Sequence, residues 1–286
     1  MTTSMRNRLR SGLTWGLALA YLGLLLFLPM AGLFLKTLER PLPELWALVT
    51  TPVAVETYKL TFGGAFIAAL INMVFGVVLA WILVRYDFPG KRLADGLIDL
   101  PFAIPTAVAG LTLAVLYGPG GVLGQFLDPG TPLGSLFALF GIQEVRLAYS
   151  QFGVVLAMTF VTVPFVVRTV QPVLLEIEPA LEEAASSLGA TNWQTFRLVI
   201  FPQLLPAILT GFTLAFARAI GEYGSVVLIS GNVPYETLTT PVYIFQRLEE
   251  FDYAGATAVS VVLLTLSLVI LLSINALQAW SRRYDS

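Results

Sequence analysis

The sequence contains neither cysteine nor histidine. Without cysteine, the chain has no disulfide, no thiolate nucleophile and no iron–sulfur ligand of its own. Without histidine, it can build neither a Ser-His-Asp triad nor a histidine zinc site, and it has no histidine proton relay. These two absences exclude several of the commonest enzyme chemistries, and no other convergent set of nucleophile, base or metal ligands stands out.

Charge is also scarce. Only 12% of the residues are charged and 57% are hydrophobic, whereas a soluble domain carries about 25% charged residues. The mean hydropathy of +0.81 is that of an integral membrane protein. A net charge of −2 gives no global attraction to nucleic acid. No G-x-x-x-x-G-K-[ST] motif occurs, so we expect no ATP site and no cofactor in this chain.

Six stretches are apolar and long enough to cross a bilayer. Lipid offers no partner for backbone N–H and C=O groups, so a spanning segment must be a helix or a barrel strand. A helix needs about 20 apolar residues to cross, and runs of this length are too long for barrel strands. The fold class is therefore all-α, with spans predicted at residues 13–35, 60–84, 97–117, 152–173, 204–229 and 256–280.

Two features indicate how these spans pack. Pro101 and Pro105 should bend the third span or give it an irregular start. Small residues four apart, such as the pair Thr106/Gly110, allow helices to approach closely in lipid. Both features predict a packed bundle and say nothing about its cargo.

The distribution of Lys and Arg predicts the orientation, because cytoplasmic segments carry the excess of these residues. With both termini in the cytoplasm, ten fall in inner segments and five in outer loops. The inner ones are Arg6, Arg8, Arg10, Arg85, Lys91, Arg92, Arg168, Arg197, Arg282 and Arg283, and the outer ones are Lys36, Arg40, Lys59, Arg146 and Arg247. Residues 1–12 and 281–286 are then short cytoplasmic ends, and residues 13–56 form the first span and an outer loop.

The inner segment at residues 176–202 has the pattern of two short helices joined by a turn. Pro179 suits a first helical position, and Glu182 and Glu183 favour the positive end of the helix dipole. Gly189 stands where a left-handed residue ends a helix. Thr191 and Gln194 then form a capping box, which predicts a second helix leading into the fifth span.

The first of these helices has a modest apolar face, which is made by Leu181, Ala184, Ala185 and Leu188. That face could rest on the chain's own bundle, lie at the lipid surface or dock into a groove of a partner. The residues alone leave the three alternatives open.

A known signature fits this segment. The order E-A-A, three residues, G, nine residues, I-x-L-P resembles the loop of permease subunits of bacterial ATP-binding-cassette importers. Glu183, Ala184, Ala185, Gly189 and Pro202 match it, while Val199 and Phe201 replace the Ile and Leu. The resemblance implies a type I (MetI-like) permease fold over residues 57–280. It also implies that the helix of Glu183 is a coupling helix, inserted into a cleft of an ATPase subunit that uses ATP and Mg²⁺.

Longer stretches are similar to the T-type permease of sulfate/thiosulfate importers. "PFVVRTVQPVL", "FARAIGEYGSVVLISGN" and "RLEEFDYAGATAVS" carry the likeness, which extends from Tyr58 to Gln278. Molybdate permeases share the R-A-x-G-E-x-G block, but the stretch near Phe251 favours sulfate. The resemblance implies a W-type permease, two ATPase subunits and an external sulfate-binding protein as partners in the inner membrane.

The fifth span contains two charged residues, Arg218 and Glu222, at i and i+4 on one helical face. Charges inside a bilayer are costly and usually face protein or water. The pair is either a structural salt bridge or a weak, transient contact for the anion. Gly221 would loosen the helix there, as a gate requires.

Two alternatives follow from the same residues, one within the same class and one of a different class. A molybdate or tungstate permease would share most of the features above. A gradient-driven secondary anion transporter would need no ATPase, but such proteins normally carry several membrane acids or histidines, and Glu222 is the deep acid here.

Overall fold

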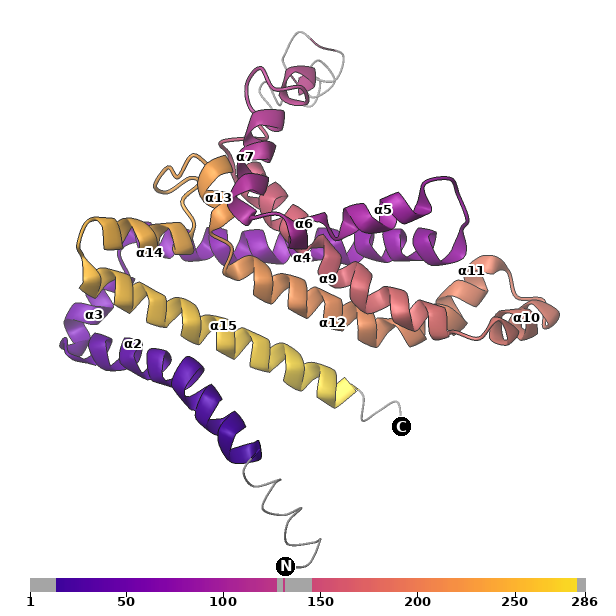
Figure 1. Ribbon diagram of the computed structural model, residues 1–286, viewed down its shortest axis with the longest axis horizontal. Helices are drawn as coiled ribbons and strands as arrows, with labels where there is room; N and C mark the ends of the chain where they lie inside the picture. Colours follow the sequence, from indigo (N-terminus) through magenta and orange to yellow (C-terminus); the bar gives the residue numbers. More distant parts are fainter. Residues whose placement is uncertain (1–13, 128–130, 132–145, 282–286) are drawn as a thin grey trace, which may run out of the picture.

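The computed structural model describes residues 14–127, 131 and 146–281, and in these residues the regular elements are helices (Figure 1). Five helices are long and apolar enough to cross a membrane: Thr14–Leu38, Pro52–Arg85, Gln151–Glu176, Asn192–Ile220 and Tyr253–Ala276. They match five of the six predicted spans and confirm the all-α class. The predicted ends at residues 1–12 lie outside the described residues, as do 282–286.

The described helices follow one another in chain order. Their bounds are η1 (Gly23–Phe27), α2 (Leu28–Leu38), α3 (Leu42–Val49), α4 (Pro52–Arg85), α5 (Lys91–Ile98), α6 (Leu100–Ala103), α7 (Thr106–Tyr117), η2 (Gly124–Leu127), α9 (Gln151–Glu176), α10 (Pro179–Ser187), α11 (Asn192–Thr195), η3 (Phe196–Ile200), α12 (Phe201–Ile220), α13 (Gly224–Ile229), α14 (Thr240–Glu249) and α15 (Tyr253–Ser281).

The third predicted span is not one helix. It is divided into α5, α6 and α7, and α7 is apolar but only 12 residues long. At about 1.5 Å per residue it spans about 18 Å, less than the hydrocarbon core. The break lies where proline predicted an irregularity, because the residue before a proline avoids the helical region. Ile104, which precedes Pro105, is extended with φ −98° and ψ 143°.

The predicted C-terminal end of the fifth span is wrong. The prediction ran to residue 229, but α12 ends at Ile220 and the chain leaves the helical path at Gly221. A separate helix, α13, then begins at Gly224. At its other end, α12 continues without interruption from α11 through the π-helical turn η3, which makes Asn192–Ile220 one element of 29 residues.

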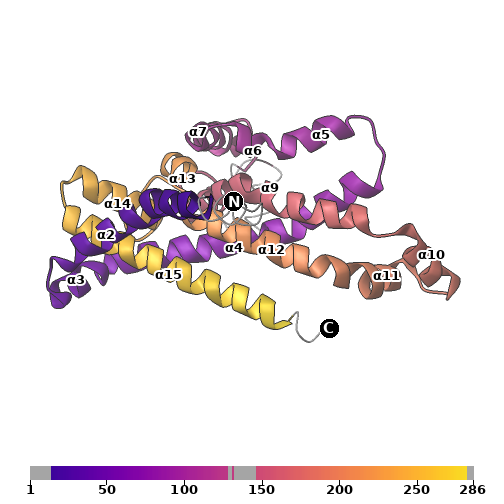
Figure 2. The same ribbon diagram turned by 60° about the horizontal axis from the view of Figure 1, so that its bottom comes forward.

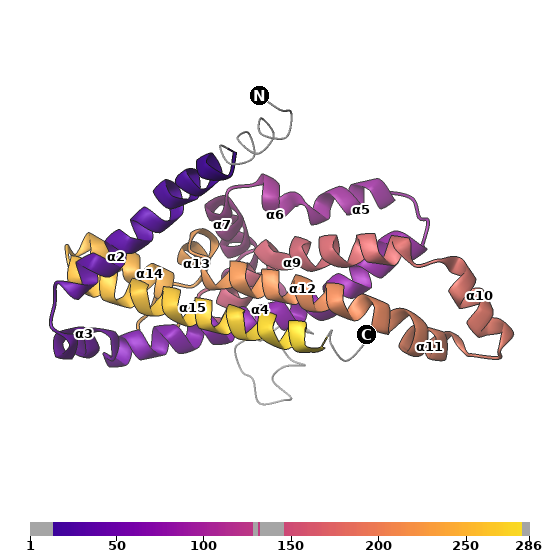
Figure 3. The same cartoon turned by 90° about the horizontal axis from the view of Figure 1, so that it is seen from below.

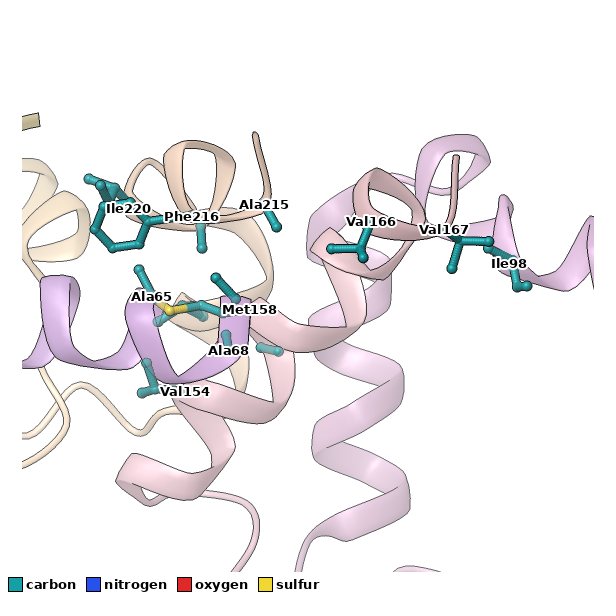
Figure 4. Close-up of a cluster of buried hydrophobic side chains, with 14 of the residues drawn as sticks. Ala65, Ala68, Ile98, Val154, Met158, Val166, Val167, Ala215, Phe216 and Ile220 are labelled. Atoms are coloured by element: carbon teal, nitrogen blue, oxygen red, sulfur yellow. The ribbon is translucent and has the colours of Figure 1, made fainter. Parts of the chain in front are cut away.

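The core lies between α4, α9 and α12. Ala65 and Ala68 of α4 meet Met158 of α9 and Phe216 of α12, and all four are buried (Figure 4). Between two of the candidate spans, Asn72 of α4 donates hydrogen bonds to the carbonyl oxygen of Thr159 and to the hydroxyl of Thr162, at 2.9 and 2.8 Å. Small side chains and one amide thus hold α4 and α9 together at close range.

A second contact joins α7 to α13. A Cβ atom placed on Gly110 would lie 2.6 Å from the Cα of Ser225, so the two backbones touch. The predicted close approach at Thr106/Gly110 is confirmed. In Figure 2 the segment α5–α7 lies on one side of the bundle and α15 on the other. The first span, Thr14–Leu38, which includes α2, stands away from the core of the bundle (Figure 1). Thr37 is the buried residue of α2.

Candidate functional site

The segment α10–α11 projects beyond the ends of α9 and α12 (Figure 3). Pro179 occupies the start of α10, and Glu182 lies in its first turn. The chain turns at Gly189, whose φ of +82° is left-handed, and the amide of Gly189 donates to the carbonyl oxygen of Ser186 at 2.9 Å. Few residues other than glycine adopt this conformation without strain. The predicted helix end is confirmed.

The capping box is also confirmed. The backbone amide of Thr191 donates to Oε1 of Gln194 at 2.8 Å, and the amide of Gln194 donates to the Thr191 hydroxyl at 3.3 Å. Two amides at the start of α11 are thereby satisfied. Because α11 continues into η3 and α12, the turn at Gly189 is directly joined to a helix that crosses the membrane region.

The apolar face of α10 is largely exposed in the described part of the chain. Leu181 is 43% exposed and Leu188 is 90% exposed. Most of this face is therefore open to the lipid surface or to a partner, although Ala185 is partly buried and α10 contacts α11 and η3. Glu183, Ala184, Gly189 and Pro202 are exposed and Ala185 is partly buried, so the predicted coupling residues lie on an accessible surface.

One contact of α10 was missed by the sequence reasoning. Glu182 Oε1 accepts a hydrogen bond from Nη2 of Arg85, at the end of α4. The guanidinium of Arg85 also lies over the ring of Trp81, 5.3 Å from its centroid. The two charged partners are 97 residues apart, and no local pattern in the sequence signals their pairing.

The predicted pair in the fifth span forms. Nη1 of Arg218 lies 2.7 Å from Oε2 of Glu222, and the exposed fractions of the two side chains are 35% and 1%. The other carboxylate oxygen of Glu222 accepts hydrogen bonds from the amide and the hydroxyl of Ser225, both at 2.8 Å. Glu222 thus stands at the break beside Gly221 and connects the end of α12 to the start of α13.

This arrangement assigns different roles to the two charges. Glu222 is buried and fully engaged, so its carboxylate is held by the protein. Arg218 keeps about a third of its side chain exposed and is the charged group of the pair that a solute could reach.

Arg168, one of the inner arginines that predict the orientation, forms ion pairs with Asp95 and Asp99, whose side chains are 42% and 47% exposed. Nε and Nη2 of Arg168 donate to the carboxylate of Asp99 at 2.8 and 2.6 Å, and Nη1 donates to Asp95 at 2.7 Å. The three side chains join the broken third span to α9. Arg168 is therefore engaged within the fold.

Arg247, on α14 outside the candidate spans, is engaged in a similar way. It donates to the hydroxyl of Tyr243 and to the carboxylate of Asp252. The hydrogen bonds to Tyr243 and the charges of Asp252 and Glu250 raise the pKa of the Arg247 guanidinium. Arg247 therefore stays positively charged, and the two carboxylates beside it balance that charge.

Comparison with known proteins adds to this geometry. The model of a family described as "Binding-protein-dependent transport system inner membrane component" matches residues 72–283. The chain belongs to this family. As a member of the binding-protein-dependent transport family, it is a permease component of the inner membrane and not an enzyme.

Relatives in this transport family match nearly the full length of the chain. The sulfate transport system permease protein CysT of Synechococcus elongatus is 54% identical over 95% of this chain and 93% of its own. The protein of the same name from Escherichia coli is 46% identical over 93% of this chain and 92% of its own.

Solved structures show the same fold. A chain of a bacterial ABC transporter involved in the import of the acidic polysaccharide alginate superposes with a TM-score of 0.76 at 18% identity, over 97% of this chain and 99% of its own. A chain of a methionine ABC transporter gives a TM-score of 0.54 at 21% identity, over 86% and 100% of the two chains. The permease fold implied by the E-A-A loop is confirmed.

Proposed function

We propose that the chain is the T-type permease subunit of an ATP-driven importer that moves sulfate and thiosulfate across the inner membrane. The observation that carries the proposal is the 54% identity, over 95% of the chain, to a sulfate transport system permease. The binding-protein-dependent family supplies the class of transporter. The anion is inferred from the relatives.

The partners follow from what this chain lacks. It has no phosphate-binding loop, so two ATP-binding subunits hydrolyse ATP with Mg²⁺ on its behalf. A homologous W-type permease completes the pathway, because one bundle of this size leaves little room for a lumen. An external sulfate-binding protein delivers the anion and provides the affinity.

The largely exposed face of α10 supports docking to an ATP-binding subunit. A face on which Leu188 is 90% exposed gains stability when a partner covers it. Glu183, Ala184, Ala185 and Gly189 form this coupling surface. Closure of the ATP-binding subunits then moves α10. This movement switches the pathway between an outward-open and an inward-open state.

The continuous helix Asn192–Ile220 supports transmission of that movement. Its 29 residues extend about 43 Å at 1.5 Å per residue. One end is joined to α10 through the turn at Gly189 and the capping box, and the other end carries Arg218. A displacement of α10 is therefore delivered to the charged pair at the break near Gly221.

Arg218 is proposed as a transient contact for the anion. Its positive charge is accessible, but Glu222 neutralises part of it at 2.7 Å. A dianion therefore meets a weak attraction, and conduction requires release as well as entry. Glu222 keeps the arginine in position.

Uptake of labelled sulfate into proteoliposomes tests the proposal. The complete complex, with binding protein outside and ATP at the ATPase side, should accumulate sulfate, and unlabelled thiosulfate should compete better than molybdate. Arg218→Ala should abolish uptake while the complex stays assembled, and Arg40→Ala, an exposed outer arginine, should have no effect. Normal uptake by Arg218→Ala contradicts the role of Arg218. Uptake that needs no ATPase but collapses with the proton gradient contradicts the proposed function.

A further inference from the structure

The position of α10 depends on few contacts. Both of its ends are non-helical joints: Ile177 and Glu178 are extended on one side, and Gly189 is left-handed on the other. Among the described residues, α10 packs on its chain neighbours α11 and η3. A nine-residue helix between two such joints can pivot unless another contact fixes its angle.

The ion pair between Glu182 and Arg85 is that contact. In the part of the chain that the structure describes, it is the one side-chain hydrogen bond that connects α10 to a distant element. The exposed fractions of the Arg85 and Glu182 side chains are 23% and 30%, so the pair is partly shielded from water. Screening is weaker there than for a fully exposed pair.

Arg85 is itself held by Trp81, which belongs to an aromatic cluster with Trp193, Phe196 and Phe201. Its guanidinium lies over Trp81 on the preceding turn of α4. Trp81 meets Phe196 of η3 edge to face, with ring centroids 5.4 Å apart. Phe196 in turn stacks on Trp193 at 5.7 Å and packs against Phe201 at 6.0 Å. Stacking and cation–π contacts of this kind restrict the guanidinium to one orientation.

This arrangement gives α10 two attachments to the bundle. One runs through the chain, from Gly189 into α11 and α12. The other runs through Glu182 and Arg85 into α4, which packs against both α9 and α12. When the ion pair is intact, a movement of α10 must carry α4 with it. When the pair is absent, α10 can rotate about its joints at Ile177–Glu178 and Gly189, and its movement need not reach α4.

We propose that Arg85 and Glu182 are positioning residues that fix the angle of α10 and transmit the stroke of the ATPase into α4. The inference rests on the proposed docking of α10 to an ATP-binding subunit. Neither residue needs to contact that subunit or the anion. Their role is to keep the number of anions transported per ATP hydrolysed high.

The test measures the ratio of anion taken up to ATP hydrolysed in reconstituted full complexes. Glu182→Gln and Arg85→Gln should each lower this ratio by at least about threefold, the size of effect seen for residues within a coupled network. The charge-exchanged variant R85E/E182R restores the ion pair but not the cation–π contact with Trp81, so it should recover part of the loss. Asp87→Asn removes an exposed partner of Lys91 at the same end of α4 and should leave the ratio unchanged.

The outcomes separate the two proposals. If the wild-type chain purifies without an ATP-binding subunit, the proposed function fails. If the subunit is present and the single variants keep the wild-type ratio, or the charge exchange restores nothing, the positioning role is refuted. A surface ion pair with no such role would leave the ratio intact, because exposed pairs contribute little to stability.

A second measurement does not depend on transport activity. The chain has no native cysteine, so Asp87→Cys and Ser187→Cys place two spin labels at defined positions of this chain, and the complex without these two cysteines gives the background from the partner subunits. The distance distribution between the labels should be narrow in the full complex and should broaden when Arg85→Gln is added. An unchanged distribution refutes the claim that the pair fixes the angle of α10.

Discussion

Replacement of Glu222 gives a graded test of the charged pair at the break between α12 and α13. The carboxylate makes three contacts at once: an ion pair with Arg218 at 2.7 Å and hydrogen bonds from the amide and the hydroxyl of Ser225 at 2.8 Å. Breaking a buried ion pair from one side costs about 3–5 kcal/mol, since the other charge is left without a partner. Arg218 is 35% exposed, so the lower end of this range applies.

Three substitutions separate these contributions to the free energy of unfolding. Glu222→Ala removes every contact and should destabilise the chain by about 3–4 kcal/mol. Glu222→Gln keeps an acceptor for Ser225 but removes the charge, and it should cost about 2 kcal/mol. Ser225→Ala removes one hydroxyl donor and should cost about 1 kcal/mol.

The assay is unfolding in mixed micelles by titration with SDS, followed by circular dichroism. The double variant R218A/E222A decides the cause. If the stranded arginine is the main cost, the double variant is more stable than Glu222→Ala alone. A loss below about 0.5 kcal/mol for Glu222→Ala, or a double variant that is less stable than the single one, would refute the electrostatic reasoning.

Three further predictions use the same unfolding assay. Gly110→Val places a side chain against the backbone of Ser225 and should cost about 1–3 kcal/mol, while Gly63→Val, which has open space around it, serves as the control; equal losses would contradict the close contact of α7 and α13. Gly189→Val forces a β-branched residue to a φ of +82° and should cost about 1–3 kcal/mol, more than Gly189→Asn; the reverse order would be inconsistent with a left-handed turn. Arg168→Leu leaves its two aspartates without a cation and should cost about 2 kcal/mol; wild-type stability would show that this cluster contributes nothing.

Local signals predicted the ends of the short helices well. The glycine at 189 and the Thr191–Gln194 capping box each act over three or four residues, so the sequence contains all the information that their geometry requires. The close approach at Gly110 was predictable for the same reason, because small residues four apart fall on one helical face. The contact with Ser225, however, depends on the tertiary fold.

Continuity of the spans was harder to predict. A hydropathy window registers composition, and residues 97–117 are mostly apolar, with Asp99 as the one charged residue. Pro101 and Pro105 indicated an irregular start, but not that α5, α6 and α7 would be separate helices. The end of α12 at Ile220 was masked in the same way, because the apolar residues of α13 follow almost directly.

The long-range ion pairs could not be predicted from the sequence. Arg168 lies 69 residues from Asp99, and Arg85 lies 97 residues from Glu182. Each partner viewed alone has the pattern of a solvated or anchoring charge. By contrast, Arg218 and Glu222 stand four apart on one helix, so their pairing was predictable from periodicity.

The central claim is that separate ATP-binding subunits bind this chain through α10. Affinity purification of the tagged chain from mild detergent, with the co-eluting chains identified, tests it most directly. Leu188→Glu is the matched variant, because a side chain that is 90% exposed can be replaced without disturbing the fold. The wild-type chain should elute with ATP-binding subunits and a second permease, and Leu188→Glu should keep the permease but lose the ATP-binding subunits. Equal recovery of those subunits with both chains, or their absence from the wild-type eluate, would contradict the claim.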